Sequence, residues 1–153
     1  MNKYQILDVL PHREPMILID SLDSYDNDSC ICKVEITKES PFYNENQAAV
    51  PSYIGIEYMA QAIAAYSGAN ALDNNEKVTI GFLLGSRKYK TFKSYFTLNA
   101  LLTINIKQLY QEESGLSVFE CEILDQTSEL LAQANINVYQ PSDADAFINE
   151  ANE

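Results

Sequence analysis

One apolar segment, residues 51–68, constrains the fold more than any other part of this sequence. It begins at a proline, which a first helical turn tolerates because the missing N–H would have no partner there. Its side chains are apolar or small almost all round the predicted helix, so the helix must be buried on most of its sides. The exceptions are Glu57, about two turns in from Pro51, and Gln61, one turn further on the same face. We therefore expect a helix from Pro51 to Gly68 that lies against a sheet.

Alternating apolar and polar residues predict strands on both sides of this helix. An apolar run at residues 16–22, a polar turn at 26–29 and strict alternation over 30–37 are typical of a β-hairpin. After the helix, residues 98–107 alternate most clearly, and further strands are predicted around 116–124 and 130–139. A short helical turn is expected over residues 4–10, ending at Pro11. This order predicts an α+β fold with an antiparallel sheet wrapped around one long buried helix.

Length and charge predict the domain organisation and exclude some functions. With 153 residues, of which 46% are hydrophobic, we expect one domain over residues 1–140, followed by an acidic tail at 141–153. The net charge of -12 argues against nucleic-acid binding, because phosphate contacts need clustered basic residues. Neither a signal peptide nor a membrane span is indicated, which predicts a cytoplasmic protein. A helix without a polar face needs more cover than one small sheet provides, so a dimer is expected.

The cysteines and the histidine indicate neither a disulfide framework nor a metal site. Cys30 and Cys32 would share one face of one strand, and with Cys121 they are interpreted as small apolar core residues. His12 is the single histidine, so the ligands of a zinc site are missing. We expect no metal and no cofactor.

Glu57 is the strongest candidate for chemistry. Burying a charged carboxylate is costly unless it is paired, and a carboxyl group in apolar surroundings suits a general acid. The alternative is a partly exposed glutamate that the helix dipole favours. Free N–H groups at the helix start, near Ser52 and Tyr53, could bind a substrate carbonyl as negative charge develops on it. His12, just before the first predicted strand, is either a base or a structural hydrogen-bonding residue.

Two motifs carry a resemblance to a known family. Residues 10–16 read Leu-Pro-His-Arg-Glu-Pro-Met, and residues 51–61 read Pro-Ser-Tyr-Ile-Gly-Ile-Glu-Tyr-Met-Ala-Gln. They resemble the Leu-Pro-His-Arg-x-Pro segment and the Pro-Gly-x-x-x-x-Glu-x-Met-Ala-Gln helix of the 3-hydroxyacyl-[acyl-carrier-protein] dehydratases, in particular their short, divergent relatives of aryl-polyene and polyketide-like pathways. Residues 82–85 and 89–92 are similar, more weakly, to the strand after that helix. The resemblance implies a hotdog fold and dehydration of a carrier-bound 3-hydroxyacyl thioester to the trans-2-enoyl thioester.

The resemblance also implies roles for residues of the helix. Glu57 falls on the catalytic carboxylate that acts on the 3-hydroxyl leaving group. Ser52 falls on the glycine whose backbone N–H holds the thioester carbonyl. From their positions in the sequence, Tyr53 beside Ser52, Gln61 one turn after Glu57 and Tyr43 before the helix are further candidates for substrate binding.

The segment before the helix departs from the family pattern. The family has a Gly-His-Phe-Pro segment there, whereas residues 41–50 read Pro-Phe-Tyr-Asn-Glu-Asn-Gln-Ala-Ala-Val and contain no histidine. Dehydration needs a base for the α-proton as well as an acid. His12 is the histidine that could replace the missing base; alternatively Tyr43, Glu45 or Asn46 lines the site.

Three functions therefore remain open. The first is a dehydratase that uses Glu57 as acid and His12 as base. The second, favoured by the missing loop histidine, is a non-catalytic acyl-thioester-binding or partner subunit. The third is a hotdog thioesterase, against which the Met-Ala-Gln segment argues. The implied partners are an acyl carrier protein and a second copy or a related hotdog subunit, and the cluster Arg87, Lys88, Lys90 and Lys93 is either a docking patch for an acidic carrier or an ordinary solvated strand edge.

Overall fold

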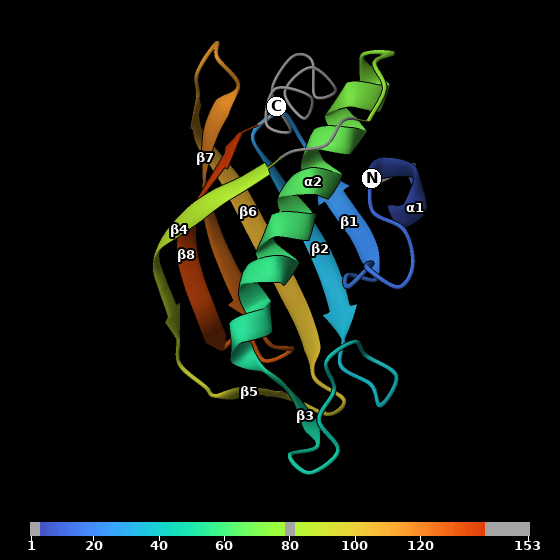
Figure 1. Cartoon of the computed structure of the whole chain (residues 1–153), viewed down its shortest axis with the longest axis vertical. Coiled ribbons are helices and arrows are strands. Elements are labelled where there is room, and N and C mark those ends of the chain that lie inside the picture. The colour runs from blue at the N-terminus through green and yellow to red at the C-terminus, as the bar shows by residue number, and fades with distance from the viewer. Residues whose placement is uncertain (1–3, 79–81, 140–153) are drawn as a thin grey trace, which may run out of the picture.

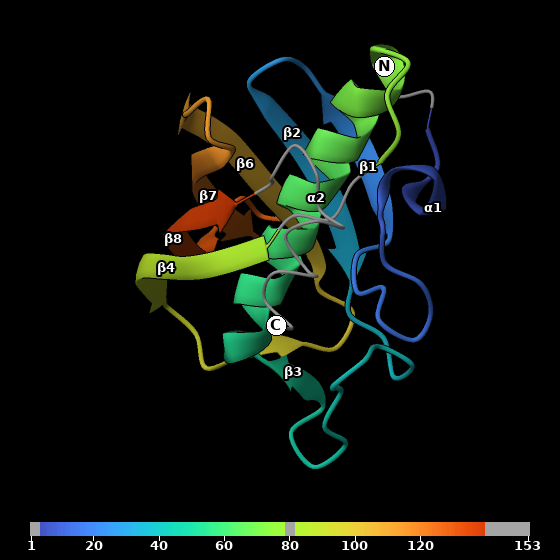
Figure 2. The same cartoon turned by 45° about the horizontal axis from the view of Figure 1, so that its top comes forward.

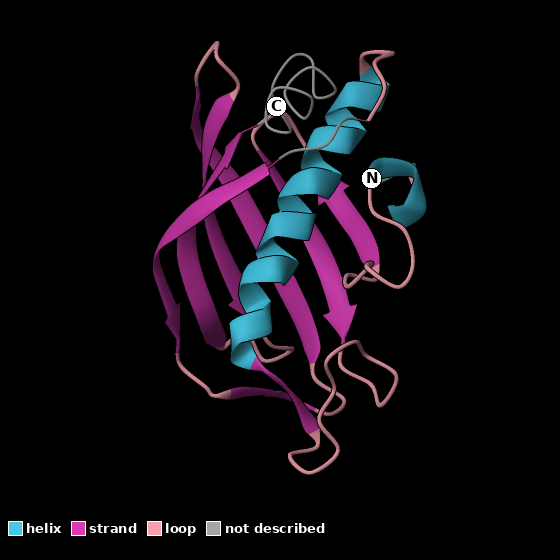
Figure 3. Cartoon of the chain, in the orientation of Figure 1, coloured by secondary structure: helices cyan, strands magenta, loops and turns pink. Residues whose placement is uncertain are grey.

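A computed structural model of the chain describes residues 4–78 and 82–139, and its central element is a long helix. This helix, α2 (Gly55–Asp73), follows a short 3-10 turn, Ser52–Ile54. A six-stranded antiparallel sheet curves around it in the strand order β1-β2-β6-β7-β8-β4 (Figures 1 and 3). The α+β layout predicted from the sequence, a sheet wrapped around one helix, is thus confirmed.

The remaining elements are short at the N-terminal side and long at the C-terminal side. The large sheet consists of β1 (Ser21–Tyr25), β2 (Ser29–Glu35), β4 (Phe82–Thr91), β6 (Leu101–Gln111), β7 (Leu116–Leu124) and β8 (Leu130–Tyr139). A second sheet pairs β3 (Ala49–Pro51) with β5 (Tyr95–Thr97), and a single helical turn, α1 (Ile6–Val9), lies near the N-terminus. The predicted acidic tail lies outside the described residues.

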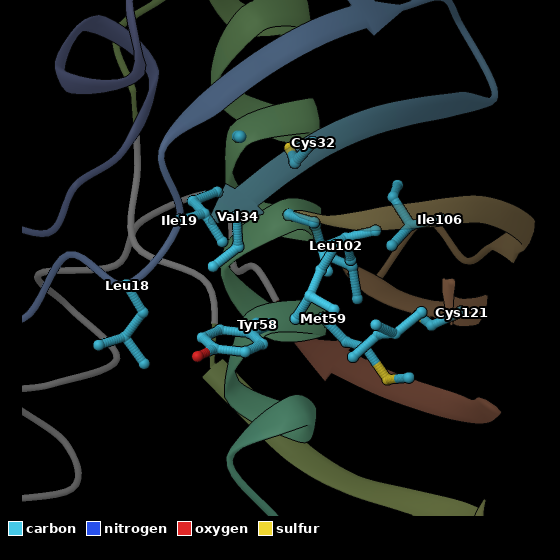
Figure 4. Packing of buried hydrophobic residues seen from close by; sticks show 14 of the residues in the cluster. Leu18, Ile19, Cys32, Val34, Tyr58, Met59, Leu102, Ile106 and Cys121 are labelled. Carbon is cyan, nitrogen blue, oxygen red and sulfur yellow. The ribbon is translucent and has the colours of Figure 1, made fainter. Parts of the chain in front are cut away.

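The concave face of the sheet and the inner side of α2 form one apolar core. Alternate residues of β6, namely Leu102, Ile104 and Ile106, are buried, as the strand alternation predicts. Figure 4 shows Tyr58 and Met59 of α2 and Leu102 of β6 in one cluster of buried side chains. Exposure of the apolar side of α2 to water would be unfavourable. The packing of this side against the sheet therefore holds the helix in place.

The three cysteines belong to this core. Cys30, Cys32 and Cys121 are free and buried, which confirms the interpretation of these residues as small apolar side chains. The Cys30 thiol donates to the Ala62 carbonyl of α2 at 3.3 Å. Burial raises the pKa of the Cys30 and Cys121 thiols well above the usual value.

The predicted hairpin is present, but its first strand starts later than expected. β1 pairs antiparallel with β2, yet it begins at Ser21 rather than at residue 16. The Met16 carbonyl and the Leu18 N–H bond to the Gln61 side chain of α2 instead of to a neighbouring strand. Residues 17–19 are therefore a buried segment tied to the helix and not part of β1.

The helix differs from the predicted range, Pro51 to Gly68, at both ends. It begins at Gly55, because Pro51 belongs to β3 and Ser52–Ile54 form a 3-10 turn, and it continues to Asp73. Gly68 serves close packing instead, because a Cβ at this position would lie 1.9 Å from the Val9 carbonyl oxygen. The end of α2 is held by two tyrosine hydroxyls, since Tyr4 and Tyr25 donate to the Asp73 carboxylate at 2.6 and 2.7 Å.

One long side of α2 is less covered than the other. Ile56, Glu57, Ala60 and Ala64 are half-buried, whereas the residues that face the sheet are buried. The sheet lies on one side of α2 only, and no described helix or strand covers the side that faces the viewer in Figure 2. No helix among the described residues is long and apolar enough to cross a membrane.

Replacing Gly68 tests the contact between α1 and α2. At a solvent-exposed position inside a helix, Gly→Ala raises the free energy of unfolding by about 1 kcal/mol. Here we expect Gly68→Ala to lower the free energy of unfolding by roughly 2 kcal/mol, because the new methyl group overlaps the Val9 carbonyl. Urea denaturation measures the difference. Gly85→Ala is the control, since nothing lies within 4 Å of a Cβ there, and a Gly68→Ala variant as stable as the parent would contradict the contact.

Candidate active site

Gln61 joins the two sequence motifs. Its side chain is fully buried at 0% exposure, on the face of α2 next to the segment at residues 16–18. The amide oxygen accepts the Leu18 N–H at 2.9 Å, and the amide nitrogen donates to the Met16 carbonyl at 2.7 Å. The same nitrogen approaches a Glu57 carboxylate oxygen at 3.5 Å. One amide thus fixes the segment after His12 to the helix turn that carries Glu57.

Glu57 lies in the first turn of α2, on its less covered side. It is half-buried, between the half-buried side chains of Ile56 and Ala60. Gln61 is one turn away on the same face, as its spacing predicts. The carboxyl group is therefore held from one side and accessible from the other, an arrangement that suits proton transfer to a bound substrate.

His12 is partly buried in the turn before β1. Its Nδ1 atom is buried and has no hydrogen-bond partner among residues 4–78 and 82–139. Its carbonyl accepts the Arg13 guanidinium at 2.7 Å, and Arg13 also donates to the Leu10 carbonyl at 2.9 Å. Within the described chain no hydrogen bond joins His12 to Glu57, so the link between their segments runs through Gln61.

The start of the helix is fixed by hydrogen bonds on both sides of Ser52. The Ser52 N–H donates to the Ser94 carbonyl at 3.0 Å, and the Ser52 carbonyl accepts both the Gly55 N–H and the Tyr89 hydroxyl. The N–H that the family resemblance assigns to the thioester carbonyl is therefore occupied in this structure. The next N–H, that of Tyr53, belongs to the first helical turn and has no partner within it.

The loop before the helix contributes little to this arrangement. Tyr43 is half-buried and packs against the core, whereas Glu45 and Asn46 are exposed. Among the described residues, none of the three forms a hydrogen bond with Glu57. The acidic, cysteine and histidine side chains that the structure describes also form no group that could hold a metal ion.

Sequence reasoning missed Tyr89 and Ser94 as partners of the helix start. They come from β4 and from the turn before β5, more than thirty residues after Ser52. The sequence signals are an aromatic residue between two lysines and the weak family similarity of residues 89–92, and neither shows that this strand passes the start of the helix.

Replacing Gln61 tests whether its side-chain amide holds residues 16–18 against α2. Gln61→Met keeps the approximate volume but leaves the Leu18 N–H and the Met16 carbonyl without partners. We expect the free energy of unfolding to fall by roughly 3 kcal/mol, because each buried unsatisfied group is costly. Denaturation by urea measures this, with exposed Gln111→Met as the control. Equal stability of the two variants would contradict the role of the amide.

Relatives in sequence are dehydratases. The model of a family described as ApeP-like, ApeP dehydratase, matches residues 4–149. The 3-hydroxyacyl-[acyl-carrier-protein] dehydratase FabZ of Methylobacterium nodulans is 32% identical over 90 residues, which cover 56% of this chain and 57% of the relative. FabZ of Chlamydia caviae is 30% identical over 106 residues, covering 66% and 68%. The chain thus spans little more than half the length of the first of these relatives.

Solved structures agree with the sequence relatives. The dehydratase heterocomplex ApeI:P from Xenorhabdus doucetiae superimposes with a TM-score of 0.90 at 29% identity, covering 99% of this chain and 100% of that chain. A hypothetical thioesterase with coenzyme A from Streptococcus pneumoniae TIGR4 has a TM-score of 0.62 at 13% identity, covering 78% and 83%, and shares the fold alone. With the family match over residues 4–149, these findings show that the chain is a hotdog-fold member of the ApeP-like dehydratase family.

Proposed function

We propose that this protein dehydrates 3-hydroxyacyl thioesters bound to an acyl carrier protein, releasing water and forming the trans-2-enoyl thioester. The observation that carries the proposal is the Glu57 carboxyl group, which the Gln61 amide holds on the less covered side of α2. Membership in a dehydratase family and the FabZ relatives support the reaction type.

The reaction needs two proton transfers, one from C2 of the substrate to a base and one from an acid to the 3-hydroxyl group. A base removes the proton at C2, the electrons of the C2–H bond form the C2–C3 double bond, and the C3–O bond breaks. Glu57 gives its proton to the departing hydroxyl, which leaves as water. A helix-start N–H stabilises the negative charge on the thioester carbonyl, and the geometry favours the N–H of Tyr53 over that of Ser52. Tyr43 would line the site from the preceding loop.

His12 is the base in this proposal. The support is its Nδ1 atom, which has no hydrogen-bond partner in the described chain, and the bonds of Gln61 that tie its segment to α2. Within the described residues His12 makes no hydrogen bond with Glu57, so a second subunit is expected to shape the site around both.

A hotdog partner would cover the open side of the helix. The half-buried Ile56, Ala60 and Ala64 form a row of small and apolar side chains along α2. β4 ends the sheet and pairs there with β8, so its other edge can bond to another strand. The relative in the ApeI:P heterocomplex is part of a two-component dehydratase, which supports a dimer with a copy or with a related subunit. We place this assembly in the cytoplasm, where free cysteines such as those of the core are usual.

Two substitutions test the assignment of acid and base. Glu57→Gln should lower dehydration of a carrier-bound 3-hydroxyacyl thioester at least about 100-fold, because a neutral amide cannot supply the proton. His12→Ala should cost a similar factor if His12 is the base. Absorbance of the enoyl thioester measures turnover, and exposed Glu120→Gln on β7 is the control.

The outcomes separate the three functions. Full activity of His12→Ala would remove His12 from the mechanism. A folded but inactive chain that gains activity only when a related hotdog subunit is added would favour the partner-subunit role, for which the missing loop histidine argues. Release of a free thiol without formation of an enoyl thioester would instead identify a thioesterase.

A basic strip beside the site would receive the carrier. Lys88, Lys90 and Lys93 are exposed, and Lys93 alone forms an ion pair among the described residues of the strip, with Glu129 at 3.7 Å. Tyr89, between two of these lysines, bonds to Ser52 at the start of α2. In a chain with a net charge of -12, this strip is the local surface that complements an acidic carrier.

Charge reversal tests the strip. The double variant Lys88→Glu and Lys90→Glu should raise KM for the carrier-bound substrate roughly tenfold, because attraction becomes repulsion. KM for the same acyl group on N-acetylcysteamine should stay unchanged, since this small thioester has no carrier. Lys107→Glu on β6 is the control. Equal effects on both substrates, or none on either, would exclude the strip as the carrier site.

A further inference from the structure

Tyr89 reaches the start of α2 because β4 contains an irregularity. The pairing of β4 with β8 shifts register between Arg87 and Lys90, and Lys88 has a positive φ of 56°. A β-bulge of this kind redirects side chains and is common beside functional sites. Lys88 and Lys90 remain exposed, whereas the Tyr89 hydroxyl donates to the Ser52 carbonyl at the helix start.

The contact is tightly fitted. A Cβ at Gly55 would lie 2.3 Å from the Tyr89 hydroxyl oxygen, so any larger residue at this turn would displace that hydroxyl. The Ser52 carbonyl also accepts the Gly55 N–H, and the Ser52 N–H is bound by Ser94. Burial raises the pKa of Tyr89 to about 12, so its hydroxyl stays protonated and can donate at neutral pH.

We infer that Tyr89 is a positioning residue for the reacting end of α2. A peptide group is planar and trans, so the Tyr53 N–H points away from the Ser52 carbonyl that Tyr89 holds. Two donors on that carbonyl also polarise the peptide and make its N–H a stronger donor. The same contact fixes the turn that leads to Glu57, two residues after Gly55. This inference rests on the proposed function, because it names the residue that orients the thioester-binding N–H and the catalytic carboxyl group.

Tyr66, which lies on α2 itself, provides a comparison for Tyr89. Its hydroxyl donates to the Asn27 carbonyl at 2.5 Å, the same length as the bond from Tyr89 to Ser52. Burial raises the pKa of Tyr66 to about 12 as well. It lies nine residues after Glu57, which is about 13 Å along a helix. The Tyr66 hydroxyl also lies 3.2 Å from the Gln108 side-chain oxygen, so removing it costs at least as much hydrogen bonding as removing the Tyr89 hydroxyl. Of the two, only Tyr89 lies at the proposed site.

The experiment compares Tyr89→Phe with Tyr66→Phe in the full chain, together with the partner subunit if turnover requires it. For Tyr89→Phe we expect kcat to fall about tenfold with KM changed less than about twofold, because the reacting groups lose their orientation while the substrate still binds. Tyr66→Phe should keep the parental kcat. Equal midpoints of urea denaturation for the two variants would exclude a general loss of stability as the cause.

An infrared measurement tests the inference without turnover. A 3-hydroxyacyl N-acetylcysteamine thioester with an isotope-labelled carbonyl is bound to the Glu57→Gln protein, with and without Tyr89→Phe. The carbonyl band should shift to lower frequency on binding, and the shift should shrink when Tyr89 is replaced but not when Tyr66 is replaced.

The outcomes distinguish this inference from the proposed function. An inactive parent protein whose bound thioester still shows a Tyr89-dependent shift would overturn the dehydratase but keep the positioning role. Identical kcat values and identical carbonyl shifts for the two variants would overturn the positioning role and keep the dehydratase. A parent protein that neither turns over nor binds the thioester would overturn both.

Discussion

The amide of Gln61 is the interaction on which the candidate site depends. It is buried among apolar side chains, where an unsatisfied amide would be costly, and its oxygen and nitrogen are both used by the backbone of residues 16–18. These two bonds determine which end of the amide is nitrogen and therefore point an N–H at Glu57. The early segment of the chain, the central helix and the candidate acid thus share one fixed geometry.

Glycines allow the helix to approach its neighbours closely at two points. Gly68 lets α2 touch the backbone of α1 at Val9, and Gly55 lets the Tyr89 hydroxyl lie against the first turn. Between them, the helix presents its apolar side to the strands β2, β6 and β7. Close contact at Gly55 with the Tyr89 side chain and at Gly68 with the Val9 backbone prevents α2 from sliding along the concave sheet, and so Glu57 keeps its place relative to β4.

The sequence predicted those features that depend on local pattern. The apolar helix, the hairpin of β1 and β2 and the pairing of Glu57 with Gln61 on one face all follow from side-chain periodicity. The predicted strand start at residue 16 and the predicted helix end at Gly68 were wrong. The strand begins only at Ser21 because the Leu18 N–H bonds to Gln61, and Gly68 lies inside the helix because it packs against Val9. Tyr89 was missed for a related reason. Which strand passes the helix start depends on the order of strands in the sheet, and no local pattern encodes that order.

The buried thiols can be used to detect local opening of the core in solution. Only a thiolate reacts quickly with alkylating reagents, and the raised pKa values and burial of Cys30 and Cys121 suppress that form in the folded state. Cys30 and Cys32 lie on β2 and Cys121 on β7. Ile106 of β6 pairs with both Cys30 and Cys121, so these two thiols sit at one level of the sheet. The natural chain therefore carries its own reporters of local opening: the rate at which these thiols are labelled follows how often the core between α2 and the sheet opens.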